Sequence, residues 1–317
     1  MNKIVEAMPV EDVVRELTSE RLLRQTNNGN NEVYVFTGSE SPVLMHEVGR
    51  LREATFRAAG GGTGKNSDLD DYDLSETAPH TQLIVWDPDN RIIIGGYRFF
   101  IHDNRKKPVD PSDMASASFF YFSDDFAHNY LPYLMELGRS FVQPDYQSRA
   151  MGRKSLFALD NLWDGLGAII IDNPHIRYLF GKVTMYPHFN IEARNLIIYF
   201  MKKHFSDPDR LVVPRKDISL NIDHAEMQAI LNSTDYREDY KILSQEVRKL
   251  GENIPPLINA YMNLSPSMRT FGTIYNESFG KVEETGIMIT IRDMYIEKIN
   301  RHLASYREDY DIGLTNP

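Results

Sequence analysis

Apolar residues recur along the first part of the chain with two spacings, one typical of helices and one typical of strands. Over Pro9–Gln25 they follow every third or fourth position, which predicts an amphipathic helix. Glu32–Thr37 has the composition of a strand, and Pro42–Ala59 has helical spacing and ends at a run of glycines. We therefore expect a helix, a strand and a second helix in this order.

The central part of the chain alternates strands and helices. Leu83–Trp86 and Ile92–Phe100, joined by the turn Asp87–Asn90, predict a β-hairpin. The elements expected after a polar loop are a strand over Leu134–Val142, a helix over Gln147–Gly165, a strand over Arg177–Met185 and a helix over Ile191–Phe205.

The pattern weakens from Asp217 onwards. It indicates a helix over Tyr236–Leu250 and another that starts at Pro255. Two later segments, Phe271–Tyr275 and Gly286–Ile291, have β character. We expect this last third to pack on the rest of the chain.

Composition and charge exclude several classes of protein. The 317 residues include 42% hydrophobic and 11% aromatic residues, as in a globular protein, and the formal charge of −10 argues against a nucleic-acid partner. Without cysteine, the chain has no disulfides, thiolate metal sites or cysteine nucleophile. The nine histidines show no metal-ligand spacing, so we predict no metal site. The mixed N-terminus and the lack of a long apolar run predict a cytoplasmic protein.

The glycine-rich segment Gly60–Lys65 is similar to a phosphate-binding loop but lacks parts of that motif. The motif requires a glycine where Ala59 stands, and serine or threonine where Asn66 stands. No strand precedes the segment, so we predict a mobile loop and not a phosphate site.

A cationic stretch between Glu136 and Lys154 is the strongest candidate for a functional site. A predicted strand leads into a short loop whose Gly152 opens a helix, and free N–H groups at a helix start suit a phosphate. The stretch has four basic residues, which are Arg139, Arg149, Arg153 and Lys154, against the single acid Asp145. We therefore expect a phosphorylated ligand.

The loop in this stretch resembles the signature of the GNAT acyltransferase superfamily. Gln147, Ala150 and Gly152 occupy the three signature positions, although Ala150 replaces the usual glycine. The wider pattern is similar to the N-acyltransferases that begin ornithine-lipid and glycine-lipid synthesis, and to the related acyl-homoserine-lactone synthases. The residues that carry this likeness between Val43 and Leu303 are Arg52, Phe56, Asp70–Asp73, Arg98, Glu136, Arg139, Tyr178–Gly181, Arg215 and Ile254–Leu257.

This resemblance implies an α/β (α+β) fold with a mixed, mostly antiparallel central sheet flanked by helices. It also implies three parts of the chain. These are an N-terminal helical extension over 1–30, a GNAT-like acyltransferase core over 31–216 and a C-terminal elaboration over 217–317 that packs on the core.

The activity implied is the transfer of a long, 3-hydroxylated acyl chain from acyl carrier protein to the α-amino group of glycine or ornithine. No cofactor would be tightly bound, because the acyl-phosphopantetheine of the carrier protein, or of acyl-CoA, is a co-substrate. Transient contact with the inner membrane would follow from the apolar product.

The chemistry of acyl transfer requires an unprotonated amine held against a polarised thioester. Glu136 is our candidate for the general base, and Arg139 would position it or bind the carrier. Without cysteine we expect direct attack by the amine.

The resemblance implies further binding residues. Those implied for the pantetheine arm are Gln147, Arg149, Ala150, Gly152, Arg153 and Lys154, and those for the acyl or amino-acid end are Arg52, Phe56, Asp70, Asp73 and Arg98. The acidic carrier protein would dock on Arg149, Arg153 and Lys154, extended by Lys202 and Lys203.

Other interpretations of the same residues stay open. Glu136 and Arg139 are three apart, so on a regular strand they point to opposite faces and each would form a structural ion pair. The aromatic segment Phe119–Phe122 suits either the core or the floor of an acyl tunnel. The alternative functions are a short-chain acetyltransferase using acetyl-CoA, an autoinducer synthase, and a non-catalytic module that binds an acyl carrier or lipid.

Overall fold

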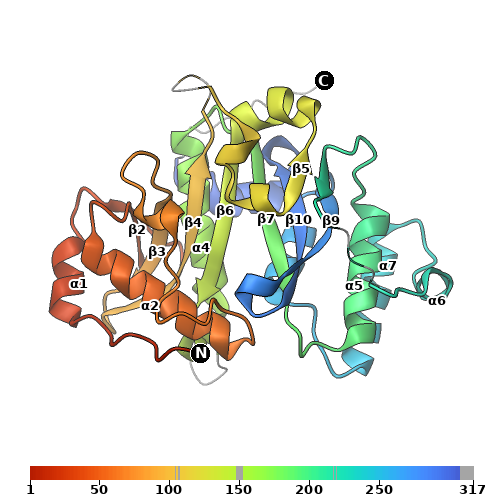
Figure 1. Ribbon diagram of the computed structural model, residues 1–317, viewed down its shortest axis with the longest axis horizontal. Helices are drawn as coiled ribbons and strands as arrows, with labels where there is room; N and C mark the ends of the chain where they lie inside the picture. The colour runs from red at the N-terminus through yellow and green to blue at the C-terminus, as the bar shows by residue number, and fades with distance from the viewer. Residues whose placement is uncertain (104, 106–107, 148–152, 217, 219, 308–317) are drawn as a thin grey trace.

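A computed structural model of the protein describes residues 1–103, 105, 108–147, 153–216, 218 and 220–307, without the side chains of residues 153–156. A mixed sheet of eight strands runs through its centre (Figure 1). The strand order is β1-β2-β3-β4-β6-β7-β10-β9, and every neighbouring pair is antiparallel except β6 and β7. Their bounds are β1 Leu22–Gln25, β2 Glu32–Phe36, β3 Thr81–Asp87, β4 Ile92–Ile101, β6 Leu134–Val142, β7 Tyr178–Met185, β9 Arg269–Asn276 and β10 Val282–Thr290. A small second sheet pairs β5 (Phe120–Phe122) with β8 (Val212–Pro214).

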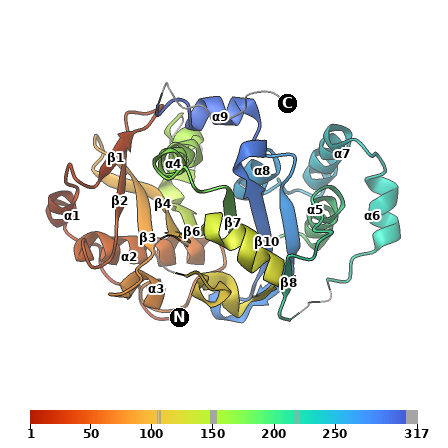
Figure 2. The same cartoon turned by 90° about the horizontal axis from the view of Figure 1, so that it is seen from above.

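Helices cover both faces of the sheet. Figure 2 shows α2 and α3 on one side and α4, α8 and α9 on the other, with α5, α6 and α7 grouped beyond β9. The helix bounds are α1 Val10–Glu16, α2 Pro42–Ala58, α3 Asp71–Leu74, α4 Arg153–Asp172, α5 Ile191–His204, α6 His224–Ile230, α7 Tyr236–Lys249, α8 Pro256–Met262 and α9 Ile296–His302. Local chemistry sets several of the starts: a proline begins α2 and α8, and the Asn190 side chain accepts hydrogen bonds from the first turn of α5.

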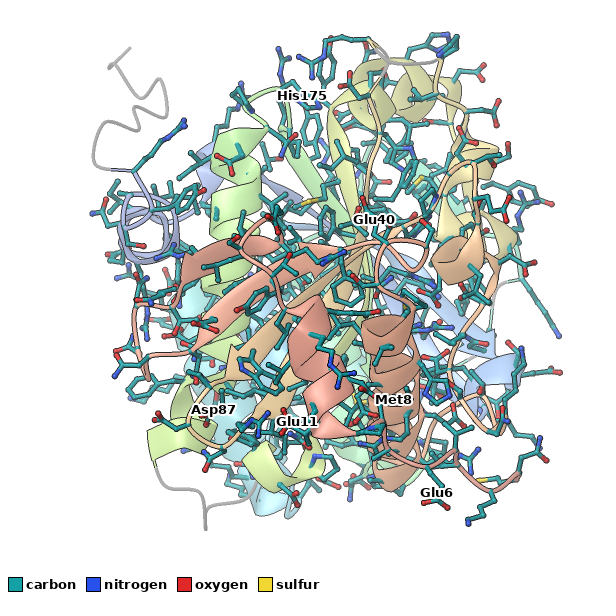
Figure 3. All side chains as sticks on the ribbon, turned by 90° about the vertical axis from the view of Figure 1, so that its left-hand side faces the viewer. Glu6, Met8, Glu11, Glu40, Asp87 and His175 are labelled. Atoms are coloured by element: carbon teal, nitrogen blue, oxygen red, sulfur yellow. The ribbon has the colours of Figure 1, made fainter. Side chains whose placement is uncertain are left out.

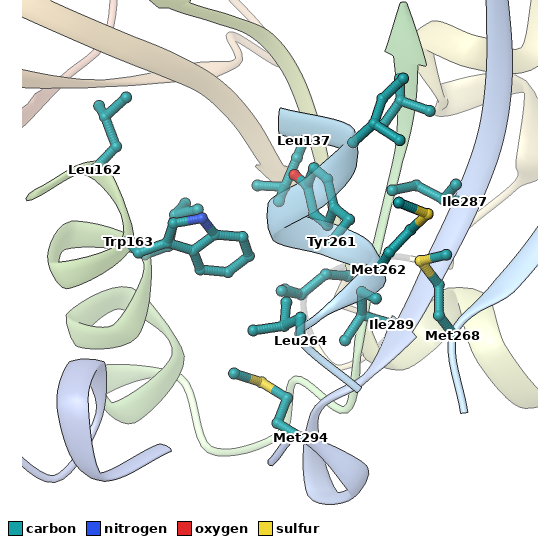
Figure 4. Close-up of a cluster of buried hydrophobic side chains, with 14 of the residues drawn as sticks. Leu137, Leu162, Trp163, Tyr261, Met262, Leu264, Met268, Ile287, Ile289 and Met294 are labelled. Atoms are coloured by element: carbon teal, nitrogen blue, oxygen red, sulfur yellow. The ribbon is translucent and has the colours of Figure 1, made fainter. Parts of the chain in front are cut away.

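The alternation of side chains along the strands divides the core between these two layers. Tyr97 and Phe99 of β4 and Met135 and Leu137 of β6 pack towards α4 and α8. Figure 4 shows this layer, where Trp163 of α4 meets Tyr261 of α8 with ring centroids 5.6 Å apart. On the other face, Phe141 and the apolar side of α2 form a second buried cluster.

The parallel pair β6–β7 is short. Only Leu134–Glu136 of β6 pair with Tyr178–Phe180 of β7, and no pairing continues beyond them. In addition, β6 carries a bulge, because two residues, Arg139 and Ser140, stand opposite Tyr97 of β4. Arg139 takes the left-handed conformation, with φ 50°. The two central strands therefore part after Glu136.

The N-terminal segment runs beside α2, as Figure 3 shows around Glu6 and Met8. The Met8 N–H donates to the Glu47 carboxylate at 3.0 Å, and the Asn2 N–H donates to the Gly64 carbonyl at 2.9 Å. Among the described residues, no helix combines the length and apolarity needed to cross a membrane.

The predicted fold class is confirmed, and the predicted elements of the central part are present with shifts at their ends. One prediction is wrong: the helix expected over Pro9–Gln25 ends at Glu16, and Leu22–Gln25 forms the edge strand β1 instead. The reason is tertiary, because β1 pairs with β2 across a turn at residues 26–31. The division at 30 and 216 stays a prediction. The last third of the chain contributes β9 and β10 to the same sheet.

We predict that Gly167→Ala destabilises the protein, although alanine is the better helix former by about 1 kcal/mol. Gly167 lies in α4 where it crosses α9, and an added Cβ would stand 2.3 Å from the His302 carbonyl oxygen. The two backbones must separate to admit it, which lowers the free energy of unfolding by about 1–3 kcal/mol. Denaturant unfolding measures this change, and an unchanged or higher stability would show that the contact is not this close.

Candidate active site

A cavity of about 880 Å³ lies where β6 and β7 part. Residues from both strands line it, including Gly138, Arg139, Gly181 and Lys182. Because these strands are the middle of the sheet, the gap between them connects its two faces. The cavity therefore passes through the sheet.

The two ends of the cavity differ in chemistry. Towards α4 and α8 the lining is mainly apolar, from Leu159, Pro256, Leu257, Ile258 and Tyr261. Towards α2 and the loop that follows it the lining is charged, from Asp68, Asp70, Arg98, Glu136 and Arg139. Such a cavity accommodates an apolar ligand at one end and a charged ligand at the other.

Glu136 is a buried carboxylate on the cavity wall, with 5% of the residue exposed. It accepts hydrogen bonds from the Ala115 N–H at 2.9 Å, the Ser116 N–H at 3.0 Å and the Ser116 hydroxyl at 2.7 Å. Burial raises the pKa of Glu136, and these hydrogen bonds oppose that rise only in part. A carboxylate has room for about four such bonds, so one position is left for a ligand.

Below the charged end, three arginines alternate with three aspartates. Arg52 is fully buried, and its guanidinium donates to Asp73 at 2.9 and 3.1 Å and to Asp68 at 3.2 Å. Burial opposes the charge on Asp73, but Arg52 and Arg98 outweigh it and hold the pKa of Asp73 well below its usual value. Three guanidinium groups thus face three carboxylates, so the formal charges of the network balance.

Asp70 joins this network to the cavity. Its side chain caps α3 by accepting from the Tyr72 and Asp73 N–H groups, and it receives the Arg98 guanidinium at 2.6 Å. Arg139 completes the network, with Nε 2.9 Å from Asp68 and the guanidinium 4.8 Å from the ring centre of Phe279.

The expectation that Glu136 and Arg139 point to opposite faces is wrong. Gly138 pairs with Arg98 and Phe141 pairs with Gly96, so the bulge adds one residue and shifts the alternation after Gly138. Both side chains consequently line the same cavity.

The residues predicted for the acyl or amino-acid end are brought together, but not all reach the cavity. Phe56, Asp70 and Arg98 line it, whereas Arg52 and Asp73 lie underneath and hold the others in place. Their roles towards a substrate stay predictions. In the aromatic segment, Phe119 lines the cavity and Phe120 is core.

The predicted pantetheine loop is described only in part. Gln147 lines the cavity, and its side-chain amide donates to the Val142 carbonyl. Arg149, Ala150 and Gly152 lie outside the described residues, and of Arg153 and Lys154 only the backbone, at the start of α4, is described. The pantetheine contacts stay predictions.

The loop Gly60–Lys65 has its N–H groups occupied by protein. The Thr63 N–H, at 3.0 Å, and the Gly64 N–H, at 2.8 Å, both donate to the carboxylate of Glu53, and the Thr63 hydroxyl donates to it at 2.7 Å. A phosphate would have to displace this carboxylate. Among the described side chains, no three His, Asp or Glu residues are placed to share a metal ion.

Sequence reasoning missed four lining residues that bear on the chemistry of the site. Lys182, on β7, pairs with Glu284, on β10, and Ser116 holds Glu136. The available signal for Lys182 was a charge within the otherwise apolar predicted strand Arg177–Met185, whereas Glu284 lies outside the predicted segment Gly286–Ile291. His80 also lines the cavity, where burial and Arg98 lower its pKa to about 3 and keep the imidazole neutral.

Comparisons with known proteins identify the family of the chain. A family model described as an acetyltransferase (GNAT) domain matches residues 51–155. Two proteins named glycine N(α)-acyltransferase are similar over nearly the whole chain. The protein from Phocaeicola vulgatus is 49% identical over 311 residues, covering 96% of this chain and 94% of its own. The protein from Bacteroides thetaiotaomicron is 48% identical over 318 residues, covering 100% and 94%.

Among solved structures, FeeM, an N-acyl amino acid synthase from uncultured soil microbes, aligns over 84% of this chain and 96% of its own. Its identity is 9% and its TM-score 0.39, values too low to add to the assignment. The family assignment rests on the two relatives from Phocaeicola vulgatus and Bacteroides thetaiotaomicron. The chain belongs to the GNAT superfamily of acyltransferases, in the branch of amino-acid N-acyltransferases that includes these two proteins.

Proposed function

We propose that the protein transfers a long, 3-hydroxylated acyl chain from the phosphopantetheine thioester of acyl carrier protein to the α-amino group of glycine. The observation that carries the proposal is the buried carboxylate of Glu136 in the wall of a cavity that passes through the sheet. Donor and acceptor can then approach from opposite faces and meet beside one base. The apolar product gives a reason for transient contact of a cytoplasmic enzyme with the inner membrane.

Glu136 would act as the general base. The acceptor arrives as an ammonium ion, so its proton must leave before the nitrogen can attack. Glu136 passes this first proton to solvent, and the neutral amine forms the N–C bond at the thioester carbonyl. The nitrogen of the adduct still carries a second excess proton. Glu136 accepts that proton and delivers it to the departing thiolate as the C–S bond breaks. The raised pKa of Glu136 suits it to accept a proton, because it is a stronger base than an exposed carboxylate. The departing thiolate is a stronger base than a carboxylate and therefore takes the proton from Glu136.

Charge pairing within the cavity favours glycine over ornithine as the acceptor. Asp68 and Asp70 are paired with arginines, and Glu284 is paired with Lys182. Among the described acids of the lining, Glu136 is the one with no ion-pair partner. Ornithine would bring a second ammonium without a second free carboxylate. The relatives named for glycine support the same choice.

The acyl donor would enter from the side of α4 and α8, where the lining is apolar. Docking of the acidic carrier protein at Arg149, Arg153 and Lys154 would bring the thioester to this side. Lys202 could extend the docking surface, but the Lys203 ammonium is bound to the Leu231 and Ser233 carbonyls and to Asp239.

The proposed function predicts N-acylglycine as the product. Purified protein is supplied with 3-hydroxyacyl carrier protein and either glycine or ornithine, and the products are identified by mass spectrometry. We expect acylglycine to form with a kcat/KM at least about tenfold above that for ornithine, because the second ammonium has no partner. Faster acylation of ornithine would overturn the choice of acceptor, and no acylation of either would overturn the function.

We predict that Glu136→Gln lowers kcat by about 10²–10⁴-fold, the usual contribution of a general base, with a smaller change in the KM for glycine. Initial rates at saturating acyl donor measure this. A folded variant with the wild-type kcat would remove Glu136 from the mechanism.

Ser116→Ala is the matched control, because it removes one hydrogen bond to Glu136 and leaves the carboxylate. The Ser116 hydroxyl lowers the pKa of Glu136, so its loss raises that pKa further. The base must be ionised to act, so the acidic limb of kcat/KM against pH moves to higher pH while the plateau is kept. A purely structural role for Glu136 would instead lower the plateau in both variants.

We predict that Arg153→Glu with Lys154→Glu raises the KM for acyl carrier protein about tenfold and leaves the KM for a carrier-free acyl-pantetheine unchanged, because two favourable charge contacts become repulsive. The control is Lys241→Glu with Arg248→Glu on exposed positions of α7, which makes the same change in net charge. An equal effect of the two double variants would contradict docking at the start of α4.

A further inference from the structure

An ion pair between a lysine and a glutamate lies in the cavity, on the side of the gap between β6 and β7 that faces Glu136. The Lys182 ammonium, on β7, is 2.6 Å from a Glu284 carboxylate oxygen, and the Asn276 amide donates to the same oxygen at 3.0 Å. The Lys182 side chain is 17% exposed, and its nitrogen lies 3.9 Å from the ring centre of Phe119. All four residues line the cavity. The proposed acyl transfer uses none of them.

The register of the parallel strands fixes where this pair lies relative to Glu136. Glu136 stands beside Phe180, so Lys182, two residues further along β7, is level with Gly138 on β6. Side chains two residues apart share a face of a strand, so Lys182 is on the face that Glu136 occupies. The strands have parted at this level, and the cavity separates them.

The space between Glu136 and Lys182 is empty of protein at Gly138. A Cβ built on Gly138 would have no atom within 4 Å, although the residue lies in the central strand of the sheet. A small molecule above Gly138 would thus have a carboxylate on one side and an ammonium on the other. This arrangement is complementary to a zwitterion.

The two arginines of the charged end are each held by two aspartates. Arg98 contacts Asp70 and Asp73, and Arg139 contacts Asp68 and Asp70. Lys182, by contrast, contacts a single carboxylate, and its ammonium has three N–H donors. Lys182 therefore has capacity to bind a second anion.

We propose that Lys182 binds the α-carboxylate of the acceptor amino acid, with Glu284 and Asn276 holding the ammonium in place. The inference rests on the proposed function, because it places the acceptor's amine at Glu136 and its carboxylate at Lys182, above Gly138. It assigns recognition of the acceptor to β7 and β10.

The test combines a change in the enzyme with a change in the acceptor. Wild type and Lys182→Met are assayed with glycine and with glycinamide, which lacks the carboxylate charge. We expect Lys182→Met to lower kcat/KM for glycine about tenfold or more and to change that for glycinamide less than about threefold. The different intrinsic reactivities of the two amines cancel, because each is compared between the same two enzymes. The KM for the acyl donor stays at the wild-type value.

Two further variants cover the case in which the loss of Lys182 destabilises the protein by leaving the buried Glu284 carboxylate without its ion-pair partner. Lys182→Met with Glu284→Gln removes the pair together and should show the same selective loss with glycine, and Lys182→Arg should restore part of the preference. A Lys182→Met enzyme, or the double variant, that still prefers glycine over glycinamide as strongly as wild type would overturn the inference. If the wild-type enzyme acylates neither acceptor, the proposed function itself has failed.

Discussion

The site depends on the point at which two parallel strands stop pairing. β6 and β7 are joined over three residue pairs and then separate, although they are the middle of an eight-stranded sheet. The separation exposes the interior of the sheet from both faces. It also explains why Glu136, the last residue of β6 that pairs with β7, is deeply buried and still lines a cavity. The bulge at Arg139 completes the opening by turning a second charged side chain to the same face.

Burying the alternating arginines and aspartates under the cavity costs free energy of desolvation. Their position beside the charged end of the site explains why the fold contains them. Burying four of these six charged side chains brings little net stability, yet removing one partner of a buried ion pair costs about 3–5 kcal/mol because the remaining charge loses its compensation. Arg52 forms ion pairs with Asp68 and Asp73. At the cavity wall, Asp73 forms an ion pair with Arg98, and Asp68 forms one with Arg139. The network thus fixes the loop between α2 and β3 against β4 and β6, and with it the charged end of the site.

Sequence patterns located most of the central sheet, because the strands of its middle are apolar and bounded by turns. They failed at Leu22–Gln25, where two adjacent leucines fit a helix or a strand equally well and pairing with β2 decides. The resemblance identified Glu136 and Arg139, but alternation alone misplaced them, since a bulge leaves no mark in the sequence. Lys182 and Glu284 are 102 residues apart. No local pattern joins them, and only the pairing of β7 with β10 brings them together.

The position of β10 within the sheet has a consequence for biosynthesis. β10 fills the place beside β7, so the strand that carries Glu284 is synthesised well after β7, with 102 residues between Lys182 and Glu284. Until then the nascent chain carries β7 as an open edge, which is a hazard for aggregation. The strands on the other side of the gap can pair earlier through local hairpins. A chain whose synthesis stops before residue 282 therefore contains Glu136 but lacks the wall of the cavity that β10 provides.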